Sequence, residues 1–163
     1  MLIRIATGAD VTAIDGLLAR AYPRLLKQDY APSILVTAIP LIARAQPGLV
    51  TCGTYFVAEE DGQIFAAGGW TAAFPGQGGT MPGRANVRHV VTDDRRTRCG
   101  IGTALLRHVM DSARVSGMTW MHCTSTRTAE PFYTALGFTR IGEVTVPLSP
   151  GIAFPAIDMR RDL

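Results

Sequence analysis

The sequence predicts an α/β fold in which one mixed sheet carries helices on its faces. Three observations predict it. Apolar residues recur at helical spacing in separate stretches, short β-rich runs are bounded by turn residues, and the two kinds of segment are interspersed. The expected order is β-α-α-β-β-β-α-β-α-β-β, which is typical of an α/β arrangement. This order is not regular enough for a doubly wound dinucleotide-binding fold.

Turn, cap and breaker residues bound the expected elements. In the first half we expect a strand at Leu2–Ala6, a helix from Val11 that Pro23 ends, a helix at Ser33–Ala45 with Pro40 as a kink or break, a hairpin of Tyr55–Glu60 and Gln63–Ala73 around Asp61-Gly62, and a loop at Phe74–Gly83. In the second half we expect a strand at Asn86–Thr92, a helix at Gly102–Ser116 stopped by Gly117, a strand at Met118–Thr124, a short helix at Ala129–Leu136 closed by Gly137, and strands at Thr139–Val146 and Ile152–Arg160.

Composition sets the broad class. The 163 residues are 47% hydrophobic and 18% charged, which predicts one domain (1–163) with a proper core and argues against disorder. The net charge of +3 suits an anionic ligand but does not indicate nucleic-acid binding. No signal peptide or membrane segment is expected. Cys52, Cys99 and Cys123 match no zinc spacing or disulfide framework, so we expect a cytoplasmic protein with free thiols and no metal.

One stretch carries the strongest functional signal: TRCGIGTALLRHV, residues Thr97–Val109. A Gly-x-Gly that opens a helix is typical of a phosphate held by backbone N–H groups. The dinucleotide fingerprint would need Gly or Ala where Leu105 stands, and an acidic residue in the later strand, which has none. The Walker A loop would need a lysine after Gly102, where Thr103 stands.

Two motifs in order closely resemble the GNAT superfamily of N-acetyltransferases. The first is RHVVTDDRRTRCGIGTALL, Arg88–Leu106, and the second is AEPFYTALGF, Ala129–Phe138. The hairpin with GGW at 68–70 extends the resemblance from about Tyr55 to the C-terminus. The resemblance implies a GNAT-like acyl-CoA N-acyltransferase fold, with a central mixed sheet of six to seven strands flanked by about four helices. It implies transfer of an acetyl group from acetyl-CoA, the cosubstrate, to a primary amine of a small molecule or protein, by direct attack through a tetrahedral intermediate.

The resemblance also implies which residues bind the coenzyme. Backbone N–H groups of the loop and of the helix start would hold the pyrophosphate, and basic side chains would add favourable electrostatic potential. The strand before the loop would lie along the pantetheine arm. An N–H at Val90 or Val91 would be the oxyanion donor. Thr97 and Thr126 stand where the family commonly has Gln or Arg, and Asn, respectively. The expected coenzyme-binding residues are Val90, Val91, Thr92, Arg96, Arg98, Cys99, Gly100, Ile101, Gly102, Thr103, Thr126 and Tyr133.

The catalytic groups are less fully defined. Tyr133 is expected to be the general acid that serves the leaving thiolate, the alternative being a packed tyrosine with its hydroxyl on a carbonyl. Many relatives place a glutamate near the start of the preceding strand, where residues 85–87 read Ala-Asn-Val. His89 and His122 are then the candidate bases, the alternative being two structural histidines. Glu59 and Glu60 are further candidates, and an amine that arrives neutral needs no dedicated base.

Several alternatives stay open or are disfavoured. A covalent acyl-cysteine at Cys99 is disfavoured because it lies at the phosphate end of the coenzyme. A metal site at His89, His122 and Cys123 is disfavoured by spacing. A coenzyme A-binding sensor or regulatory module without turnover is the main alternative function, and an oxidoreductase is remote. Pairing into a homodimer through the late strands is an option the resemblance leaves open.

Overall fold

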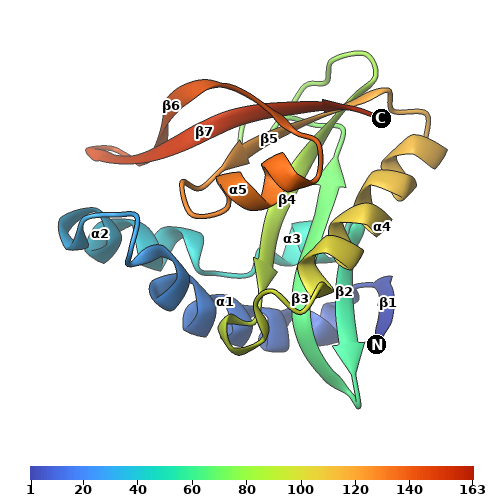
Figure 1. The fold of residues 1–163 in the computed structure, drawn as a ribbon, viewed down its shortest axis with the longest axis horizontal. Helices are drawn as coiled ribbons and strands as arrows, with labels where there is room; N and C mark the ends of the chain where they lie inside the picture. The colour runs from blue at the N-terminus through green and yellow to red at the C-terminus, as the bar shows by residue number, and fades with distance from the viewer.

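Seven strands form one mixed sheet in the order β1-β2-β3-β4-β5-β7-β6 (Figure 1). The computed structural model describes residues 1–163. The strands are β1 (Leu2–Ile5), β2 (Tyr55–Glu60), β3 (Gln63–Thr71), β4 (Arg84–Thr92), β5 (Trp120–Ser125), β6 (Thr139–Ser149) and β7 (Ile152–Asp162). Every neighbouring pair is antiparallel except β4 and β5, which are parallel. The predicted α/β fold with a mixed sheet is confirmed.

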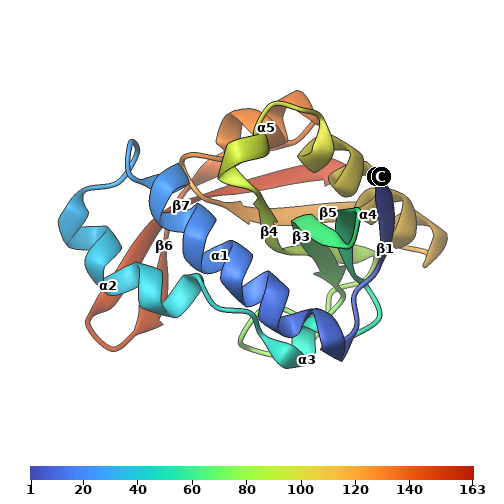
Figure 2. The same ribbon diagram turned by 90° about the horizontal axis from the view of Figure 1, so that it is seen from below.

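Helices cover both faces of this sheet (Figure 2). They are α1 (Val11–Leu26), α2 (Pro32–Ile42), α3 (Pro47–Val50), α4 (Ile101–Val115) and α5 (Glu130–Ala135). Alternation along β2 shows the two faces: Tyr55 and Val57 pack with α1, whereas Phe56 and Ala58 pack with α4. A smaller cluster joins the end of α1, α2 and Phe154 of β7. The helices therefore enclose a core on each side of the sheet, and no helix has the length and apolar character that a membrane span requires.

The end of the first helix differs from the prediction. Pro23 lies inside α1, which continues to Leu26. A proline in a helix interior removes one backbone hydrogen bond and costs about 3 kcal/mol. Here the following turn buries Leu26 against Tyr30 and Phe154, and this packing offsets the loss. Tertiary burial has overridden the local stop signal.

The second helix and the segment after it also differ in detail. Pro40 does not break α2 but lies in its last turn, and the helix ends at Ile42 instead of Ala45. The chain then forms a further short helix, α3, that the sequence did not predict. Its Leu49 and Val50 are buried against α1 and β2, which explains the turn.

The hairpin turn is as predicted. Asp61 and Gly62 both have positive φ, 51° and 76°, which is the geometry of the tight turn that favours Asp-Gly between twisted strands. The two late strands are longer than expected, since β6 runs to Ser149 and β7 to Asp162. Gly117 follows α4 with φ of 91°, as expected for a residue that stops a helix.

Candidate active site

The sheet opens between β4 and β5. Their parallel pairing is limited to three residue pairs, the last of which joins Asn86 to His122. Beyond this pair β4 continues to Thr92 and β5 to Ser125 without a common ladder. Figure 1 shows β5, β7 and β6 turned strongly relative to β2, β3 and β4. The β5-facing edge of β4 is therefore unpaired over residues 87–92, and it presents main-chain groups to the opening.

A β-bulge lies on this unpaired part of β4. The register with β3 shifts so that residues 89 and 90 stand opposite Gly68. His89 has a φ of 49°, a left-handed conformation that is uncommon for a residue other than glycine. Gly68 makes room for it, since a Cβ there would lie 2.8 Å from Val90 Cγ2. Bulges redirect strand groups next to active sites, and this one re-aims the main chain of His89 and Val90.

Two tyrosines hold the carbonyl groups of the bulge. Tyr22 of α1 donates to the Val90 carbonyl at 3.2 Å, and Tyr55 of β2 donates to the His89 carbonyl at 2.8 Å. Burial raises the pKa of both phenols, so both keep their protons at neutral pH. Two neutral phenol donors therefore fix the main chain of the bulge.

The start of α4 presents free main-chain donors. Gly100 caps the helix in the left-handed conformation, with φ of 80°, and Arg98 is also left-handed, with φ of 63°. The first bond of the helix runs from Ala104 N–H to the Gly100 carbonyl. The N–H groups of residues 100–103 have no protein acceptor. Four unpaired donors at a helix N-terminus form a site for an anion.

The second glycine of the motif has a different role from the first. A Cβ on Gly100 would meet no atom within 4 Å, so this residue is glycine for its backbone conformation. A Cβ on Gly102 would lie 2.9 Å from Thr92 Oγ1 and 3.4 Å from Phe132. Gly102 therefore lets α4 approach the end of β4 and α5 closely.

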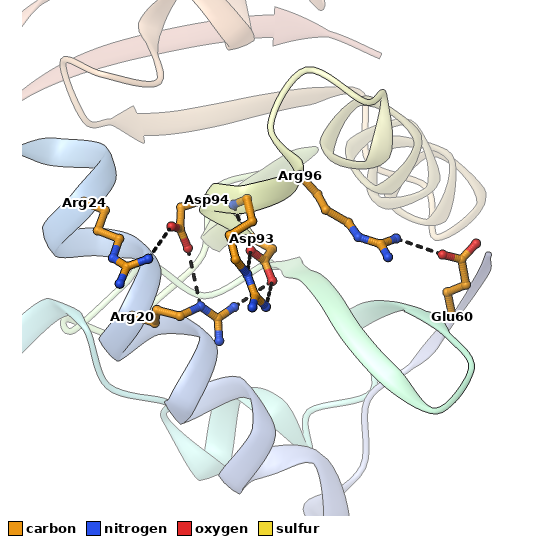
Figure 3. A network of polar contacts seen from close by, with 7 residues as sticks. Arg20, Arg24, Glu60, Asp93, Asp94 and Arg96 are labelled. Atoms are coloured by element: carbon orange, nitrogen blue, oxygen red, sulfur yellow. Dashed lines mark hydrogen bonds and ion pairs between the residues drawn. The ribbon is translucent and has the colours of Figure 1, made fainter.

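Two aspartates just after β4 connect the loop of residues 93–100, here called the phosphate loop, to α1 (Figure 3). Asp93 Oδ2 accepts from Arg20 at 2.7 Å and from Arg95 at 2.9 Å, and its Oδ1 accepts from the Arg95 main chain at 2.9 Å. Asp94 accepts from Arg20 and Arg24. The Asp93 side chain is 1% exposed, although its arginine partners reach solvent. This network fixes the entry of the phosphate loop.

Arg96 faces the hairpin on the other side. Its guanidinium pairs with Glu60 at 2.8 Å (Figure 3). The guanidinium also lies 3.6 Å from the centre of the Phe65 ring. Its charge already has a partner, so its expected contact with a phosphate stays a prediction. Arg98 and Cys99 are exposed in the loop, and the Cys99 thiol contacts only the Thr97 carbonyl.

Replacing Asp93 should loosen this loop and the fold together. Asp93→Asn removes two charged acceptor oxygens from beside two arginines, and we expect the free energy of unfolding to fall by about 2 kcal/mol. Asp111→Asn is the matched control, because Asp111 pairs with Arg114 on the exposed face of α4 and should change stability little. Urea unfolding of both variants measures the difference; equal stabilities would contradict the role of the network.

The pH dependence of stability, compared between the native protein and Asp93→Asn, gives a second test of this network. The hydrogen bond from Arg95 holds the pKa of Asp93 at about 2, below its ordinary value of 3.8. A lowered folded-state pKa contributes stability above the unfolded pKa, and this contribution is lost as the pH falls through the folded pKa. The stability difference between the native protein and Asp93→Asn should therefore be constant above about pH 5, shrink as the pH falls toward 2, and lose its carboxylate contribution below about pH 2. A difference that does not decrease between pH 5 and pH 2 would contradict the assignment.

Tyr133 lies buried on α5 beside the opening. Its ring packs edge-on against Phe132 and Phe138, with centroids 5.2 and 5.3 Å away. Burial raises the pKa of Tyr133 well above its usual value, and the neighbouring Cys123 adds to the shift. The hydroxyls of Tyr22 and Tyr55 lie close enough to contribute as well. Tyr133 is therefore a neutral proton donor that faces the same region as the bulge.

His89 is held at the bulge by a main-chain acceptor. Its Nε2 lies 2.8 Å from the Ile42 carbonyl, so this nitrogen carries the proton and donates it. Burial lowers the pKa of His89, and the charge of Arg88 lowers it further. No carboxylate faces the ring, so an imidazolium at His89 would be poorly stabilised.

His122 has a different environment, at the fork of the opening. Its Nε2 lies 3.3 Å from Asp158 Oδ1 on β7, and Thr124 donates to the same carboxylate at 3.2 Å. Burial and the charge of Arg84 lower the pKa of His122, and Asp158 partly offsets the decrease. No motif on β7 marks Asp158 in the sequence, and only the sheet register brings the two residues together.

The remaining residues of interest are threonines just before α5 and Asn86 near the start of β4. Thr126 Oγ1 accepts from Ala129 N–H at 3.1 Å, so its oxygen caps the turn before α5 while its hydroxyl proton stays free to donate. Thr128 Oγ1 is buried without a hydrogen-bond partner. Asn86 is 1% exposed and donates to the carbonyls of residues 71–73, so it is a structural amide.

No group of three His, Cys, Asp or Glu side chains is placed to hold a metal ion. Two surface hollows of about 250 and 440 Å³ lie away from the opening: one is between α1 and the β2–β3 hairpin, and the other is beside α4 and Gly137. The free N–H groups of α4, the bulge of β4 and the Tyr133 phenol instead meet at the β4–β5 opening. This arrangement can bind an anion and place a neutral acid near redirected main-chain groups.

Comparison with known proteins agrees with this arrangement. A family model described as "Acetyltransferase (GNAT) domain" matches residues 51–140, more than half of the chain. The chain is similar to a GCN5-related N-acetyltransferase from Rhodopseudomonas palustris, with a TM-score of 0.77 and 14% identity over 99% of this chain and 95% of that one.

Two further solved structures share the fold. PaiA N-acetyltransferase from Thermoplasma acidophilum, in complex with coenzyme A, has a TM-score of 0.69 at 11% identity over 99% and 98% of the two chains. Ribosomal-protein-alanine N-acetyltransferase from Brucella melitensis has a TM-score of 0.66 at 18% identity over 100% of both. No curated protein matches the chain in sequence. The family model and the fold together show that this chain belongs to the GNAT family of acetyltransferases.

Proposed function

We propose that the protein transfers an acetyl group from acetyl-CoA to a primary amine of a small molecule or a protein. The observation that carries the proposal is the set of four unpaired N–H groups at the start of α4, which lies beside the unpaired edge of β4. The PaiA structure, solved with coenzyme A, supports coenzyme A as the ligand. The ribosomal-protein-alanine N-acetyltransferase from Brucella melitensis is named for an alanine of a protein as its acceptor, which supports an amine as the acceptor class.

The residues present fit coenzyme A. The N–H groups of residues 100–103, and the loop that includes Arg98 and Cys99, would hold the pyrophosphate, where the helix dipole adds favourable potential. Val90, Val91 and Thr92 would offer main-chain groups to the pantetheine arm, because this edge of β4 has no strand partner. Thr126 keeps a hydroxyl proton for the same ligand. Acetyl-CoA supplies the activated acyl group.

Charge that develops during acyl transfer needs donors at two places. An N–H of the bulge, at Val90 or Val91, would stabilise an oxyanion, a contribution worth about 3–4 kcal/mol at comparable sites. Tyr133 would donate its proton toward the leaving sulfur, since its raised pKa keeps it protonated. Because a thiolate is a weaker base than a phenolate, a hydrogen bond in the transition state is the expected form of this donation.

His122 is the better candidate for the base. Nε2 of His122 is turned to Asp158, which leaves Nδ1 free to accept a proton from the attacking amine. The carboxylate then stabilises the imidazolium, a service that the Ile42 carbonyl cannot give to His89. The lowered pKa of His122 keeps it neutral at pH 7.

A pH profile distinguishes the two histidines. We expect kcat/KM of the native protein to fall on the acid side with an apparent pKa below 6.5, as His122 becomes protonated. His122→Gln should lower kcat/KM at pH 7 about 30-fold, less than usual for a positioned base because part of the amine arrives neutral, and should remove this acid limb. His89→Gln should retain the acid-side fall of kcat/KM. An unchanged limb in His122→Gln would exclude it as the base.

Thiol release from acetyl-CoA, measured with a panel of amines, tests the function as a whole. The proposal predicts amine-dependent release. The alternative is a sensor or regulatory module that binds coenzyme A without turnover. One observation favours it: residues 85–87, the region in which many relatives carry a glutamate, hold no carboxylate, and Asn86 is engaged in structural hydrogen bonds. Tight coenzyme binding by calorimetry without release for any amine would favour the module.

A further inference from the structure

Two arginines of β4 are half-buried and form no ion pair. Burial lowers the pKa of Arg84 and of Arg88, and the charge of Asp158 partly offsets the decrease at Arg84. The groups that face Arg88 are the phenol of Tyr55, the thiol of Cys52 and the hydroxyl of Thr71, none of which is a carboxylate. Partly desolvating a cation without a counter-charge costs free energy, so proteins usually pair such groups or use them to bind an anion.

Arg84 and Arg88 lie on the same face of the sheet. Arg84 donates to the Asn86 side chain at 2.7 Å, and Asn86 and Arg88 both donate to Thr71. Ala85 and Val87, which alternate with them on β4, pack against the α4 side of the core. Because side chains alternate along a strand, both arginines lie on the opposite face. Register places His122 and Asp158 on that face too, since His122 pairs with Asn86 and Asp158 with Thr124.

Most of the hydrogen-bonding capacity of Arg88 is unused. Its guanidinium carries five N–H groups, and a single donation, from Nη1 to Thr71 Oγ1 at 3.1 Å, is made within the protein. Nε and Nη2, one edge of the planar fork, have no protein acceptor. This edge matches the two oxygens of a carboxylate. Arg84 is held between the rings of Phe74 and Trp120 and adds positive potential nearby.

Arg88 is also close in sequence and space to the proposed reacting centre. It directly precedes the bulge, two residues before Val90, which corresponds to at most about 7 Å along the strand. An arginine side chain spans a similar length, so a group that binds its fork can lie beside the main chain of the bulge. The amine of the acceptor must reach the same place.

From this placement we propose that Arg88 binds a carboxylate of the acceptor, so that the preferred substrates are amines that carry a carboxylate, as free amino acids do. The inference rests on the proposed acetyltransferase function and specifies its substrate class. A phosphate could also satisfy the planar fork. The carboxylate is favoured because one edge of one guanidinium is free, which suits two oxygens better than three.

The test compares substrates that differ only in this charge. Thiol release from acetyl-CoA is measured for each common amino acid and for its carboxamide, which keeps the size and the amine but removes the negative charge. Phosphoethanolamine and ethanolamine form the phosphate arm. We expect kcat/KM for the best amino acid to exceed that of its amide by about 30-fold or more, mainly through KM.

Three variants locate the effect. Arg88→Met should reduce the preference to about threefold or less, because it lowers kcat/KM for the amino acid and leaves that for the carboxamide unchanged. Arg88→Lys should restore part of the preference. Arg107→Met, an exposed arginine on α4 that forms no ion pair, should keep the full preference. Calorimetry of the best-binding amino acid with the coenzyme A-bound protein gives a readout that does not depend on turnover, and thermal unfolding shows whether each variant is folded.

The outcomes separate this inference from the proposed function. Turnover without a preference for amino acids, or a preference that Arg88→Met leaves intact, overturns the carboxylate site and keeps the acetyltransferase. Amino-acid binding that Arg88→Met abolishes, without any turnover, supports the carboxylate site and rejects the acetyltransferase. A preference for phosphoethanolamine alone overturns the carboxylate in favour of a phosphate. No binding and no turnover for any compound rejects both.

Discussion

Gly100→Val should reduce the affinity for coenzyme A by about 100-fold or more. Gly100 has a φ of 80°, and a β-branched residue in the left-handed region costs about 1–2 kcal/mol or more, so the loop would leave this conformation. The N–H groups of residues 100–103 would then no longer converge. Losing two charge-assisted hydrogen bonds to phosphate, at about 1.5 kcal/mol each or more, accounts for the expected factor. Isothermal calorimetry with coenzyme A measures it.

The same helix supplies a matched control. Gly117 follows the C-terminal end of α4 with a φ of 91°, and a Cβ there would also meet no atom within 4 Å. Gly117→Val should therefore lower the free energy of unfolding by a similar amount and leave coenzyme affinity unchanged. Equal loss of affinity in both variants would mean that global destabilisation, and not the phosphate loop, explains the effect. Retained affinity in Gly100→Val would contradict the loop assignment.

Tyr133→Phe should lower kcat about 100-fold and change coenzyme affinity less than threefold. The substitution removes the proton donor but keeps the ring, which packs against Phe132 and Phe138. A positioned general acid contributes about 10²–10⁴-fold, and the lower value fits a hydrogen bond to sulfur without full proton transfer. Steady-state kinetics with saturating acetyl-CoA measures kcat, and calorimetry measures affinity.

Two further readouts control for a merely structural role of Tyr133. The Cys123 thiol is a polar neighbour of Tyr133, and burial raises the pKa of this thiol to about 12, so Cys123 is a neutral and weak partner. Cys123→Ala should therefore keep kcat within about threefold if the hydroxyl itself acts on the substrate. Thermal unfolding of Tyr133→Phe should match that of the native protein. Unchanged turnover in Tyr133→Phe would leave the tyrosine with a packing role alone.

The sequence predicted those features that depend on local chemistry. The alternation around Asp61-Gly62 located the hairpin because that dipeptide favours both φ values the turn requires. The Gly-x-Gly before an apolar helical pattern located the start of α4 within one residue, since Gly100 is a cap that few other residues can replace. The order of the seven strands and of the four longer helices was also correct, whereas the short helix α3 was missed.

Features that depend on distant contacts were not predictable in this way. Pro23 is a local stop signal, yet α1 passes through it because Leu26 finds a buried site against β7. The bulge at His89 follows from the approach of Gly68 across the sheet, which no single strand reveals. Asp158 faces His122 only because β7 inserts between β5 and β6, an arrangement that sequence order does not suggest. The half-buried, unpaired state of Arg88 likewise requires the positions of its neighbours.

The central claim is that main-chain amides at the start of α4 bind the pyrophosphate of coenzyme A. A crystal structure of the protein with acetyl-CoA tests it most directly. We expect phosphate oxygens within about 3 Å of the nitrogens of residues 100–103, with the thioester beside the bulge at Val90. Coenzyme bound elsewhere, or a helix start whose amides are closed off by the protein's own side chains, would contradict it.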